Sequence, residues 1–507
     1  MTDYYFSSAG DDTDAGTEAE PWQTWGKFLD TFESANGGDN IYFKRGETHD
    51  VDEERQIYNT NVSDTSRLTI GAYGTGDDPI ISPTGNFKPM YFGSLKTGET
   101  RDGGVNIQNL NFKCSTRNLA DRAIWLQNAF SYVTMDSITV DGFSTGLHTG
   151  KFGNTNGAED IVLINSTIKN NNTQGFYGGS HRLILDNNTF DNNGNGADSL
   201  GHNVYLAETA STGANVGFSC QVTNNKFLRN SQRYEDVVDV GTDDWTTDPI
   251  IGETVTGSIS GATGVIRELD TDQMTITLPD RDLSTRFIAT DVITSDGSKV
   301  ANNAVTASNP WDQSVSANLV VHGKFDGLVI RDNWLEQGWN DVTGAFASAQ
   351  GFGIGVGPGY NGGLGSEYFN NTVIQGNTCI HQATPISVSG GIGIEISNNF
   401  VRTSTRFTKG IFVDNTGDPD SVVTNDVNIV YNTVLMEQDP QATTASKRGI
   451  ELLDVVDGFI DHNRVFVHDD SGIIGIRTES QVTVGDNNLT MEYTEQHMAV
   501  GTDSLDN

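Results

Sequence analysis

The sequence is poor in cysteine and proline, and each shortage excludes a class of protein. It contains 3 Cys and 11 Pro among 507 residues. Cys114, Cys220 and Cys379 are odd in number and far apart, so no disulfide framework is predicted, and we expect each to fill a small apolar core position. Glycine is frequent, at 57 residues, but it follows no three-residue period, which excludes collagen.

Positive charge is also scarce. The chain has 30 Lys and Arg against 67 Asp and Glu, a formal net charge of −37. A nucleic-acid partner requires a basic footprint, and no cluster of basic residues occurs, so nucleic acid is excluded. An anionic substrate would need local cations or a bound metal to offset the repulsion.

Targeting segments and familiar catalytic motifs are missing too. The opening MTDYYFSSAGDD has neither a basic nor an apolar region, so no signal peptide is predicted. No stretch approaches the ~20 apolar residues of a membrane helix, so membrane insertion is not expected. There is no Walker loop, HExxH or GxSxG, which leaves nucleotide, zinc-protease and serine-hydrolase functions without support.

What the sequence does contain is a repeat. A unit of the form apolar–x–Asn–x–apolar recurs around Asn165, Asn188, Asn225, Asn333, Asn377, Asn399, Asn432, Asn463 and Asn488. Apart from one gap of 108 residues, the spacings of 22 to 44 residues suit one coil of a β-solenoid. Stacked coils lie ~4.8 Å apart, so equivalent Asn side chains can hydrogen-bond as a ladder. The pattern predicts an all-β, right-handed parallel β-helix; a propeller is less favoured because its regular repeat is absent.

A second strand recurs between the Asn units. Aligning AIWLQN (123–128), GLHTGK (146–151), GFYGGS (175–180) and HNVYLA (202–207) places Trp125, His148, Tyr177 and Tyr205 in one column. Apolar residues alternate with them, which favours an outward column on which sugar rings could stack. Stacking inside the core is the alternative.

Four regions are predicted along the chain. Residues 1–50 form an N-terminal cap with a short helix over WGKFLDTFESA and a first strand, and 51–246 form the first part of the solenoid. Residues 247–308 lie within the long gap, lack the Asn repeat and alternate Val, Ile and Thr with Gly turns, so we expect an inserted small β-barrel or β-sandwich. Residues 309–507 complete the solenoid and its C-terminal cap.

The opening YYFSSAGDDTDAGT with PWQTW and GDNIYFKRGETH, the Asn units and GHNVYLA (201–207) resemble pectate-lyase-like right-handed β-helix proteins. The segment GETVTGSISGATGVI (252–266) looks like small β modules of phage structural proteins. The resemblance implies this fold and a carbohydrate-related function, and most resembles a phage tailspike or depolymerase. The metal-binding Asp trio and catalytic Arg of pectate lyases match no motif here, and neither a head-binding stem nor a trimerisation domain is evident.

Polar residues concentrate in the coils beside the insertion. The candidates for catalysis are His202, Tyr205, Glu208, Glu235, Asp239, Lys324 and Asp326. The candidates for substrate contact are Trp125, His148, Lys151, Tyr177 and His322.

Two chemistries fit these residue types. A hydrolase needs two carboxylates, and Glu208 with Asp239 or Glu235 with Asp326 are the candidate pairs. A lyase needs a base, which His202, Tyr205 or Lys324 could supply, and a cation beside the sugar carboxylate, for which Lys151 and Lys324 are available.

No cofactor is required and no metal site is predicted. TGDPDS (416–421) offers oxygen ligands for Ca²⁺, and a plain turn is the favoured alternative at this segment.

The leading hypothesis is a polysaccharide-binding and -cleaving protein, a homotrimeric phage tailspike depolymerase that acts on a bacterial surface glycan and contacts other phage tail proteins. A virion tail or extracellular location follows from it. The alternatives are a free microbial polysaccharide lyase acting on acidic glycans and a non-catalytic receptor-binding or structural solenoid.

Overall fold

The computed structural model describes residues 1–491 with gaps. The gaps are 96–101, 117–118, 128, 151–157, 195–200, 209–216, 229, 231–234, 240–249, 251–252, 270–272, 278–286, 289–290, 296–315, 337–338, 341–344, 347–350, 358–367, 383, 405–408, 416–422, 438–446, 468–472 and 479–481. The contacts divide the chain into a large unit, which contains the first and last strands, and a smaller unit of Gln232–Ser314 with Gly338–Ala349.

The large unit is a right-handed parallel β-helix, as predicted, with three sheets. The first sheet contains β1 (Asp3–Phe6), β2 (Asn40–Lys44), β4 (Leu68–Tyr73), β7 (Gly103–Gln108), β10 (Ser131–Asp136), β13 (Ile161–Ile164), β16 (Ile184–Asp186), β19 (Gly217–Phe218), β20 (Gln221–Thr223), β28 (Val329–Arg331), β33 (Tyr368–Gln375), β36 (Gly391–Ser397), β39 (Asn425–Val430), β42 (Gly458–Asp461) and β45 (Val482–Val484).

The second sheet has 13 strands. They are β3 (Thr48–Val51), β5 (Ile80–Pro83), β8 (Asn111–Lys113), β11 (Thr139–Asp141), β14 (Thr167–Lys169), β17 (Thr189–Asp191), β21 (Lys226–Leu228), β29 (Trp334–Glu336), β34 (Thr378–Ile380), β37 (Phe400–Ser404), β40 (Thr433–Glu437), β43 (Arg464–Val467) and β46 (Asn488–Met491).

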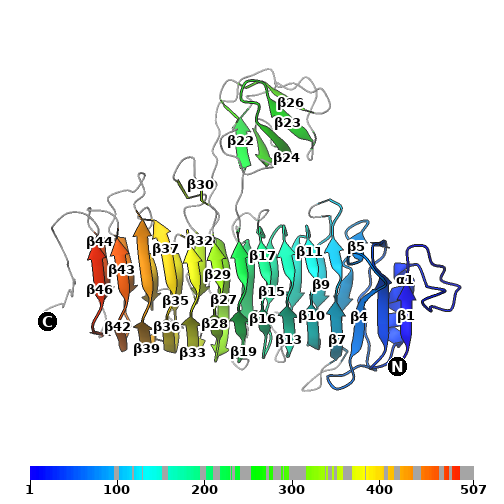
Figure 1. Ribbon diagram of the computed structural model, residues 1–507, viewed down its shortest axis with the longest axis horizontal. Helices are drawn as coiled ribbons and strands as arrows, with labels where there is room; N and C mark the ends of the chain where they lie inside the picture. The colour runs from blue at the N-terminus through cyan, green and yellow to red at the C-terminus, as the bar shows by residue number, and fades with distance from the viewer. Residues whose placement is uncertain are drawn as a thin grey trace. The chain divides into compact units, whose positions relative to one another are not determined.

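The third sheet is the one that positions the candidate site. Its strands are β6 (Met90–Phe92), β9 (Arg122–Leu126), β12 (Thr145–Thr149), β15 (Gln174–Gly178), β18 (His202–Glu208), β27 (Ser316–Asp326), β32 (Gly351–Val356), β35 (Thr384–Ser389), β38 (Lys409–Asp414), β41 (Lys447–Leu452) and β44 (Ile473–Thr478). Strand β27 continues around a corner into the first sheet, so these two sheets join. Strands of successive coils lie side by side from the N-terminal to the C-terminal end (Figure 1).

A short amphipathic helix, α1 (Trp25–Ser34), lies at the N-terminal end of the solenoid. The side chain of Thr24 caps it by accepting a hydrogen bond from Lys27 N. Its apolar face is buried, and the ring of Phe28 contacts the rings of Phe6 and Phe43 in the first two strands. The helix therefore packs on the core where the first coil leaves it open, and the predicted capping helix is confirmed.

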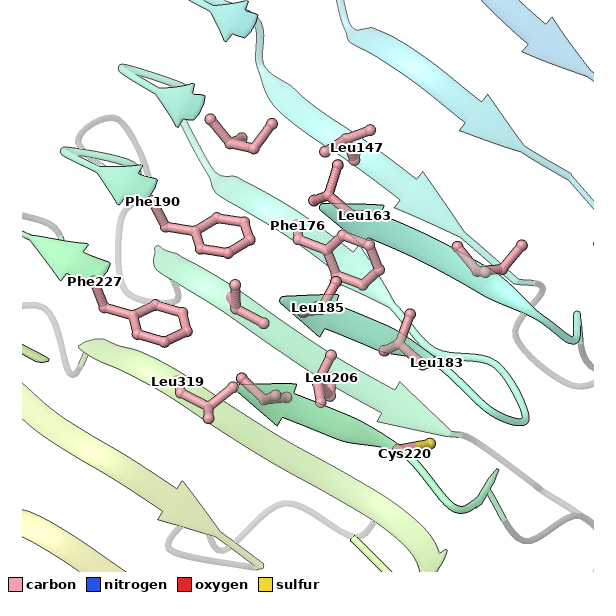
Figure 2. Close-up of a cluster of buried hydrophobic side chains, with 14 of the residues drawn as sticks. Leu147, Leu163, Phe176, Leu183, Leu185, Phe190, Leu206, Cys220, Phe227 and Leu319 are labelled. Atoms are coloured by element: carbon pink, nitrogen blue, oxygen red, sulfur yellow. The ribbon is translucent and has the colours of Figure 1, made fainter. Parts of the chain in front are cut away.

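Inward side chains of all three sheets form one continuous apolar core. In Figure 2, Phe176 and Leu206 of the third sheet, Leu185 of the first, and Phe190 and Phe227 of the second point into the same interior. Phe190 and Phe227 stack with centroids 5.2 Å apart, about one strand spacing. The alternation of inward and outward residues thus fixes which side chains remain for function.

The three cysteines are free and buried, as expected. Burial raises the pKa of the Cys114 thiol to about 11 and also raises that of Cys379. Both thiols therefore stay protonated and unreactive at neutral pH.

The asparagine ladder lies at the corner between the first and second sheets. Asn399 is typical: its Nδ2 donates to Ile374 O at 2.9 Å and to Asn432 Oδ1 at 2.9 Å, and its Oδ1 accepts from the backbone N of Asn377. The buried ladder residues are Asn188, Asn225, Asn333, Asn377, Asn399, Asn432 and Asn463. Each coil thereby satisfies its buried amides through the next coil.

The predicted ladder is wrong by one residue at both ends. Ser166 and Asn487 occupy the ladder positions, where Asn165 and Asn488 were expected. From Ser166 to Asn463, the residue before each ladder position turns the chain with a positive φ, and Asn165, with φ of 53°, is that residue in its coil. Adjacent polar residues in the sequence do not reveal which one makes the turn.

The smaller unit contains a five-stranded antiparallel sheet. Its strands, in sheet order, are β22 (Glu235–Asp239), β25 (Gln273–Thr277), β24 (Thr263–Leu269), β23 (Thr254–Gly257) and β26 (Ile293–Ser295). Buried Val255, Ile266 and Ile276 belong to its core. Asp291 accepts hydrogen bonds from the backbone N of Ile259 and Ser260, both at 2.8 Å, which ties two of its loops together. A two-stranded pair, β30 (Trp339–Asn340) and β31 (Ala345–Phe346), belongs to the same unit.

Within the described part of the chain, none of the helices has the length and apolar character that crossing a membrane requires.

Candidate functional site

The outward face of the third sheet presents a column of aromatic rings. Strand pairing places Trp125 beside His148, His148 beside Tyr177, and Tyr177 beside Tyr205. Their chain neighbours Ile124, Leu147, Phe176 and Val204 are core residues. Because side chains alternate between the two faces of a strand, the rings point away from the core.

The rings contact one another in sequence. Centroids lie 5.6 Å apart for Trp125 and His148, 4.6 Å for His148 and Tyr177, and 5.3 Å for Tyr177 and Tyr205. The column continues to Tyr91 of β6, which stacks on Trp125 at 4.6 Å with an interplanar angle of 5°. We call these five residues the ring column: Tyr91, Trp125, His148, Tyr177 and Tyr205.

Tyr91 was missed by sequence analysis, although a signal exists. The string MYF (90–92) has the same apolar–ring–apolar pattern as IWL (124–126), and Met90 pairs with Ile124. The alignment began at AIWLQN (123–128), so the shorter string at 90–92 was left out of it.

Basic side chains lie over the N-terminal end of the ring column. The Arg122 guanidinium carbon is 4.6 Å from the Trp125 ring centroid, and Lys88 Nζ is 5.8 Å from the rings of both Tyr91 and Trp125. Lys88 also forms an ion pair with Glu54 at 3.0 Å. These cations hold the rings by cation–π contacts.

Arg122 also fixes the protonation of His148. Arg122 Nε donates to His148 Nδ1 at 2.9 Å, so the ring proton of the neutral imidazole is on Nε2. Burial, together with the charge of Arg122, lowers the pKa of His148 to about 3. His148 is therefore an uncharged ring at neutral pH and behaves like its aromatic neighbours.

Two further histidines meet the C-terminal end of the ring column. The Tyr205 ring lies 5.4 Å from that of His202 and 5.6 Å from that of His322. His202 is buried, its Nδ1 accepts a hydrogen bond from Ala317 N at 2.9 Å, and burial lowers its pKa to about 3. The Nδ1 lone pair that a general base would use is thus already engaged, and catalysis by His202 stays a prediction.

The other candidates for catalysis lie apart from this group. Lys324 and Asp326 are in β27, but beyond the corner, where they pair with Tyr368 and Asn370 in the first sheet. Asp326 accepts a hydrogen bond from Asn371 Nδ2 at 2.9 Å. Lys324 therefore belongs to a different sheet from Tyr205. The alignment of the sequence treated β27 as one straight strand and did not predict its corner.

The predicted carboxylate pairs stay predictions. Glu208 is the last residue of β18, and its side chain lies outside the described part of the structure. Glu235 and Asp239 are in β22 of the smaller unit, and their side chains also lie outside the described part. Lys151 and the TGDPDS segment (416–421) are outside the described residues as well.

At the C-terminal end of the third sheet, the outward column changes character. Phe412, Glu451 and Arg477 occupy it in β38, β41 and β44. Glu451 Oε1 lies 3.0 Å from Arg477 and 3.6 Å from Arg448, and its Oε2 lies 3.2 Å from Lys409. We call Lys409, Arg448, Glu451 and Arg477 the charged cluster.

Sequence analysis missed the charged cluster. The signal is the recurrence of Gly–Ile–x in GIF (410–412), GIE (449–451) and GIR (475–477), where the third residue is the outward one. Comparing only aromatic residues along the column concealed it. Between the two ends, the column holds the smaller residues Val320, Gly355 and Ser387.

No group of three or more His, Cys, Asp or Glu residues with the arrangement of a metal site occurs among the residues that the structure describes. Calcium binding at 416–421 falls outside them and stays a prediction.

Comparisons with known proteins give similarity in structure only. No protein-family model matches the chain. No curated protein matches it either.

Several solved structures are similar. The GH136 lacto-N-biosidase from Eubacterium ramulus is 11% identical with a TM-score of 0.40, over 97% of this chain and 68% of that one. The Dettilon tailspike protein (gp208) is 11% identical with a TM-score of 0.40, over 96% and 68%. The Streptococcus pneumoniae surface protein and adhesin PfbA is 12% identical with a TM-score of 0.41, over 92% and 94%. The three proteins differ in activity, and none of them says which chemistry this chain performs. The predicted resemblance to pectate-lyase-like β-helix proteins is confirmed for the fold.

Proposed function

We propose that the protein binds a polysaccharide along the outward face of its third sheet and cleaves it. In this proposal it acts as a phage tailspike depolymerase on a bacterial surface glycan. The observation that supports binding most directly is the ring column, five rings on successive coils with centroids 4.6 to 5.6 Å apart.

Physical chemistry favours a sugar polymer as the ligand of such a surface. Aromatic rings offer large, rigid contact areas that lose little conformational entropy on binding. The column repeats at the strand spacing, ~4.8 Å, which suits a ligand that is itself a linear repeat. His148 is uncharged at neutral pH, so its ring offers a stacking surface like those of its neighbours.

For the cleavage step, Tyr205 is the candidate that the described geometry supports best. It belongs to the ring column, is only partly buried and contacts His202 and His322, so it lies where the bound glycan would lie. In a lyase it would remove the proton next to the sugar carboxylate. In a hydrolase, two of Glu208, Glu235, Asp239 and Asp326 would act instead.

A panel of bacterial and plant polysaccharides tests the proposal. Unsaturated products that absorb near ~235 nm, together with new reducing ends, would indicate a lyase, and reducing ends alone a hydrolase. Binding without either signal would contradict cleavage and leave a receptor-binding solenoid.

Replacing rings tests the binding surface itself. We expect Trp125→Ala and Tyr177→Ala each to weaken glycan binding roughly 10- to 100-fold, because each removes a large apolar contact. Trp334→Ala is the matched control: Trp334 is 41% exposed but lies on the second sheet. Equal losses in all three variants would place binding elsewhere.

Trimer formation and contact with phage tail proteins belong to the same proposal. Light scattering at micromolar concentration gives the mass directly. A monomer mass would contradict the proposed homotrimer and favour the alternative function, a free microbial polysaccharide lyase.

A further inference from the structure

The charged cluster gathers three cations around one carboxylate on the sheet that bears the ring column. Glu451 contacts Lys409, Arg448 and Arg477, the longest of these ion pairs being 3.6 Å. Its side chain is only 4% exposed, whereas those of Lys409 and Arg477 are 26% and 27% exposed. The carboxylate is thus covered, and the two cations reach the surface.

This arrangement suits the recognition of an anion. Glu451 is a carboxylate that all three cations contact. Its buried carboxylate anchors the cationic groups of Lys409 and Arg477 and so fixes their positions in advance of binding. Ammonium and guanidinium groups with part of their surface exposed form strong charge-assisted hydrogen bonds to carboxylates and sulfates.

The ring beneath the cluster gives it a second contact surface. Lys409 Nζ lies 3.1 Å from the ring centroid of Phe412, which is half-buried and outward in the same column. A sugar ring that packs near Phe412 would bring its acidic substituent beside Lys409. The cluster thereby combines an apolar surface with a cation, as the ring column does at Arg122 and Trp125.

Position along the sheet connects the cluster to the ring column. Strand β38 follows β18 by four pairings, through β27, β32 and β35, so Phe412 lies about 19 Å from Tyr205 at ~4.8 Å per strand. A polymer that extends along the outward column from Tyr205 reaches the charged cluster. A monosaccharide or a short oligomer bound at the rings does not.

Overall charge makes such a site necessary for an acidic ligand. The chain has a formal net charge of −37, which repels a polyanion over most of its surface. We propose that the charged cluster binds the carboxylate or sulfate groups of an anionic polysaccharide. This inference rests on the proposed function, because it assumes a glycan on the third sheet, and it names the class of that glycan.

The experiment compares three glycans with two double variants. Oligomers of galacturonic acid carry carboxylates, carrageenan oligomers carry sulfates, and laminarin oligomers are neutral. The test variant is Lys409→Gln with Arg477→Gln. The matched control is Lys226→Gln with Arg464→Gln, which makes the same charge change at outward positions of the second sheet.

We expect the test variant to bind an anionic oligomer about tenfold more weakly or worse, because two charge-assisted contacts are lost. The control should bind like the unaltered protein. Binding of one anionic oligomer but not the other identifies whether carboxylate or sulfate is recognised. Equal loss in test and control variants would overturn the site.

The conservative variants Lys409→Arg and Arg477→Lys keep the charge, so each should keep most of the affinity. Laminarin separates recognition from folding: a merely structural defect in the test variant would weaken laminarin and the anionic oligomers alike, whereas loss of the site weakens only the anionic oligomers. If the unaltered protein binds only laminarin, and Trp125→Ala abolishes that binding, the inference fails while the proposed function stands. If the unaltered protein binds none of a broad glycan panel, the proposed function itself fails.

Discussion

The two ends of the third sheet share a backbone and differ in what they present outward. From β6 to β18 the outward column is aromatic, and from β38 to β44 it is Phe412 followed by Glu451 and Arg477. Inward, both ends are alike: Ile124 and Leu147 at one, Ile411 and Ile450 at the other, all in the same core. The core and the pairing therefore specify the coil, and the outward residue is left free to specify the ligand.

The comparison also separates two kinds of interaction. Rings act at short range through contact area, and their effect depends little on salt. Cations act through charge, which salt screens. The following experiments test whether the two ends differ only in this outward chemistry.

The largest expected effect concerns what the two ends should share. Asn188→Ala and Asn432→Ala each remove a ladder side chain. Asn188 lies in the chain between β15 and β18, two strands of the ring column, and Asn432 lies between β38 and β41, two strands of the charged cluster. Each Asn donates to a backbone carbonyl and to the next Asn, and accepts from a backbone N–H, so each substitution leaves buried groups unpaired. We expect a loss of about 3 kcal/mol in the free energy of unfolding for both, measured by urea unfolding.

The control for the ladder is Asn398→Gly. Asn398 is exposed, with φ of 56°, a conformation that glycine adopts easily, so a change of at most about 1 kcal/mol is expected. A large difference between Asn188→Ala and Asn432→Ala would show that the two ends differ in their backbone framework as well.

Salt should separate the ends by about tenfold in affinity. Raising NaCl from roughly 0.1 M to 1 M shortens the Debye length from about 10 Å to about 3 Å. Affinity for an anionic oligomer should fall about tenfold, and that for a neutral oligomer should stay nearly constant. Titration calorimetry at the two salt concentrations measures both affinities. An equal fall in the two would contradict the assignment of charge recognition to one end of the sheet only.

Acid should also destabilise the protein, and His148 of the ring column is one of the buried histidines that contribute. Burial and Arg122 lower the pKa of His148 to about 3, below the ordinary value of 6.5. Unfolding below pH 6.5 therefore takes up a proton that the native ring does not hold, so stability is lost as the pH falls from about 6.5 towards 3.

His148→Gln removes that proton uptake, so its stability should decline less between pH 7 and pH 4 than that of the unaltered protein. Trp125→Phe is the control, since it alters a neighbouring ring without changing any titratable group. Urea midpoints at the two pH values provide the measurement, and identical pH dependence in all three proteins would contradict the assigned state of His148.

The smallest effect belongs to the stretch between the two ends. A Cβ added at Gly355 would meet its nearest atoms, in Phe352 and Val320, at 3.8 Å, which is ordinary contact. Gly355→Ala should therefore raise the free energy of unfolding by about 0.5 kcal/mol, since alanine loses less conformational entropy on folding. Destabilisation by Gly355→Ala would show that the outward column of the middle coils has no room for an added methyl group.

Much of the fold could be predicted from the sequence because its signals repeat. The Asn units predicted the solenoid, and the alternation in AIWLQN and GFYGGS predicted the column of Trp125 and Tyr177. What could not be predicted were features that occur once: the corner that takes Lys324 out of the third sheet, and the turn that makes Ser166 the ladder residue where Asn165 was expected.

The charged cluster was hidden for a different reason. Lys409 and Glu451 are 42 residues apart and Glu451 and Arg477 are 26 apart, and only the pairing of β38, β41 and β44 brings these three together. An outward position tolerates any polar side chain, so no single residue there signals a site. The role of each candidate for catalysis likewise depends on distances that no local pattern specifies.

The corner of the asparagine ladder has a consequence for the length of the binding face. Asn377 and Asn399 are 22 residues apart, each preceded by a residue with positive φ, Gly376 and Asn398. The coil between them, which includes β35, begins and ends at the same kind of turn. It is therefore a structural repeat that could be inserted once more. Repeating residues 377–398 in tandem would move the rings and the cations apart by one strand spacing, ~4.8 Å. The number of coils between the ring column and the charged cluster, rather than the shape of any loop, then determines how long a sugar chain must be to contact both.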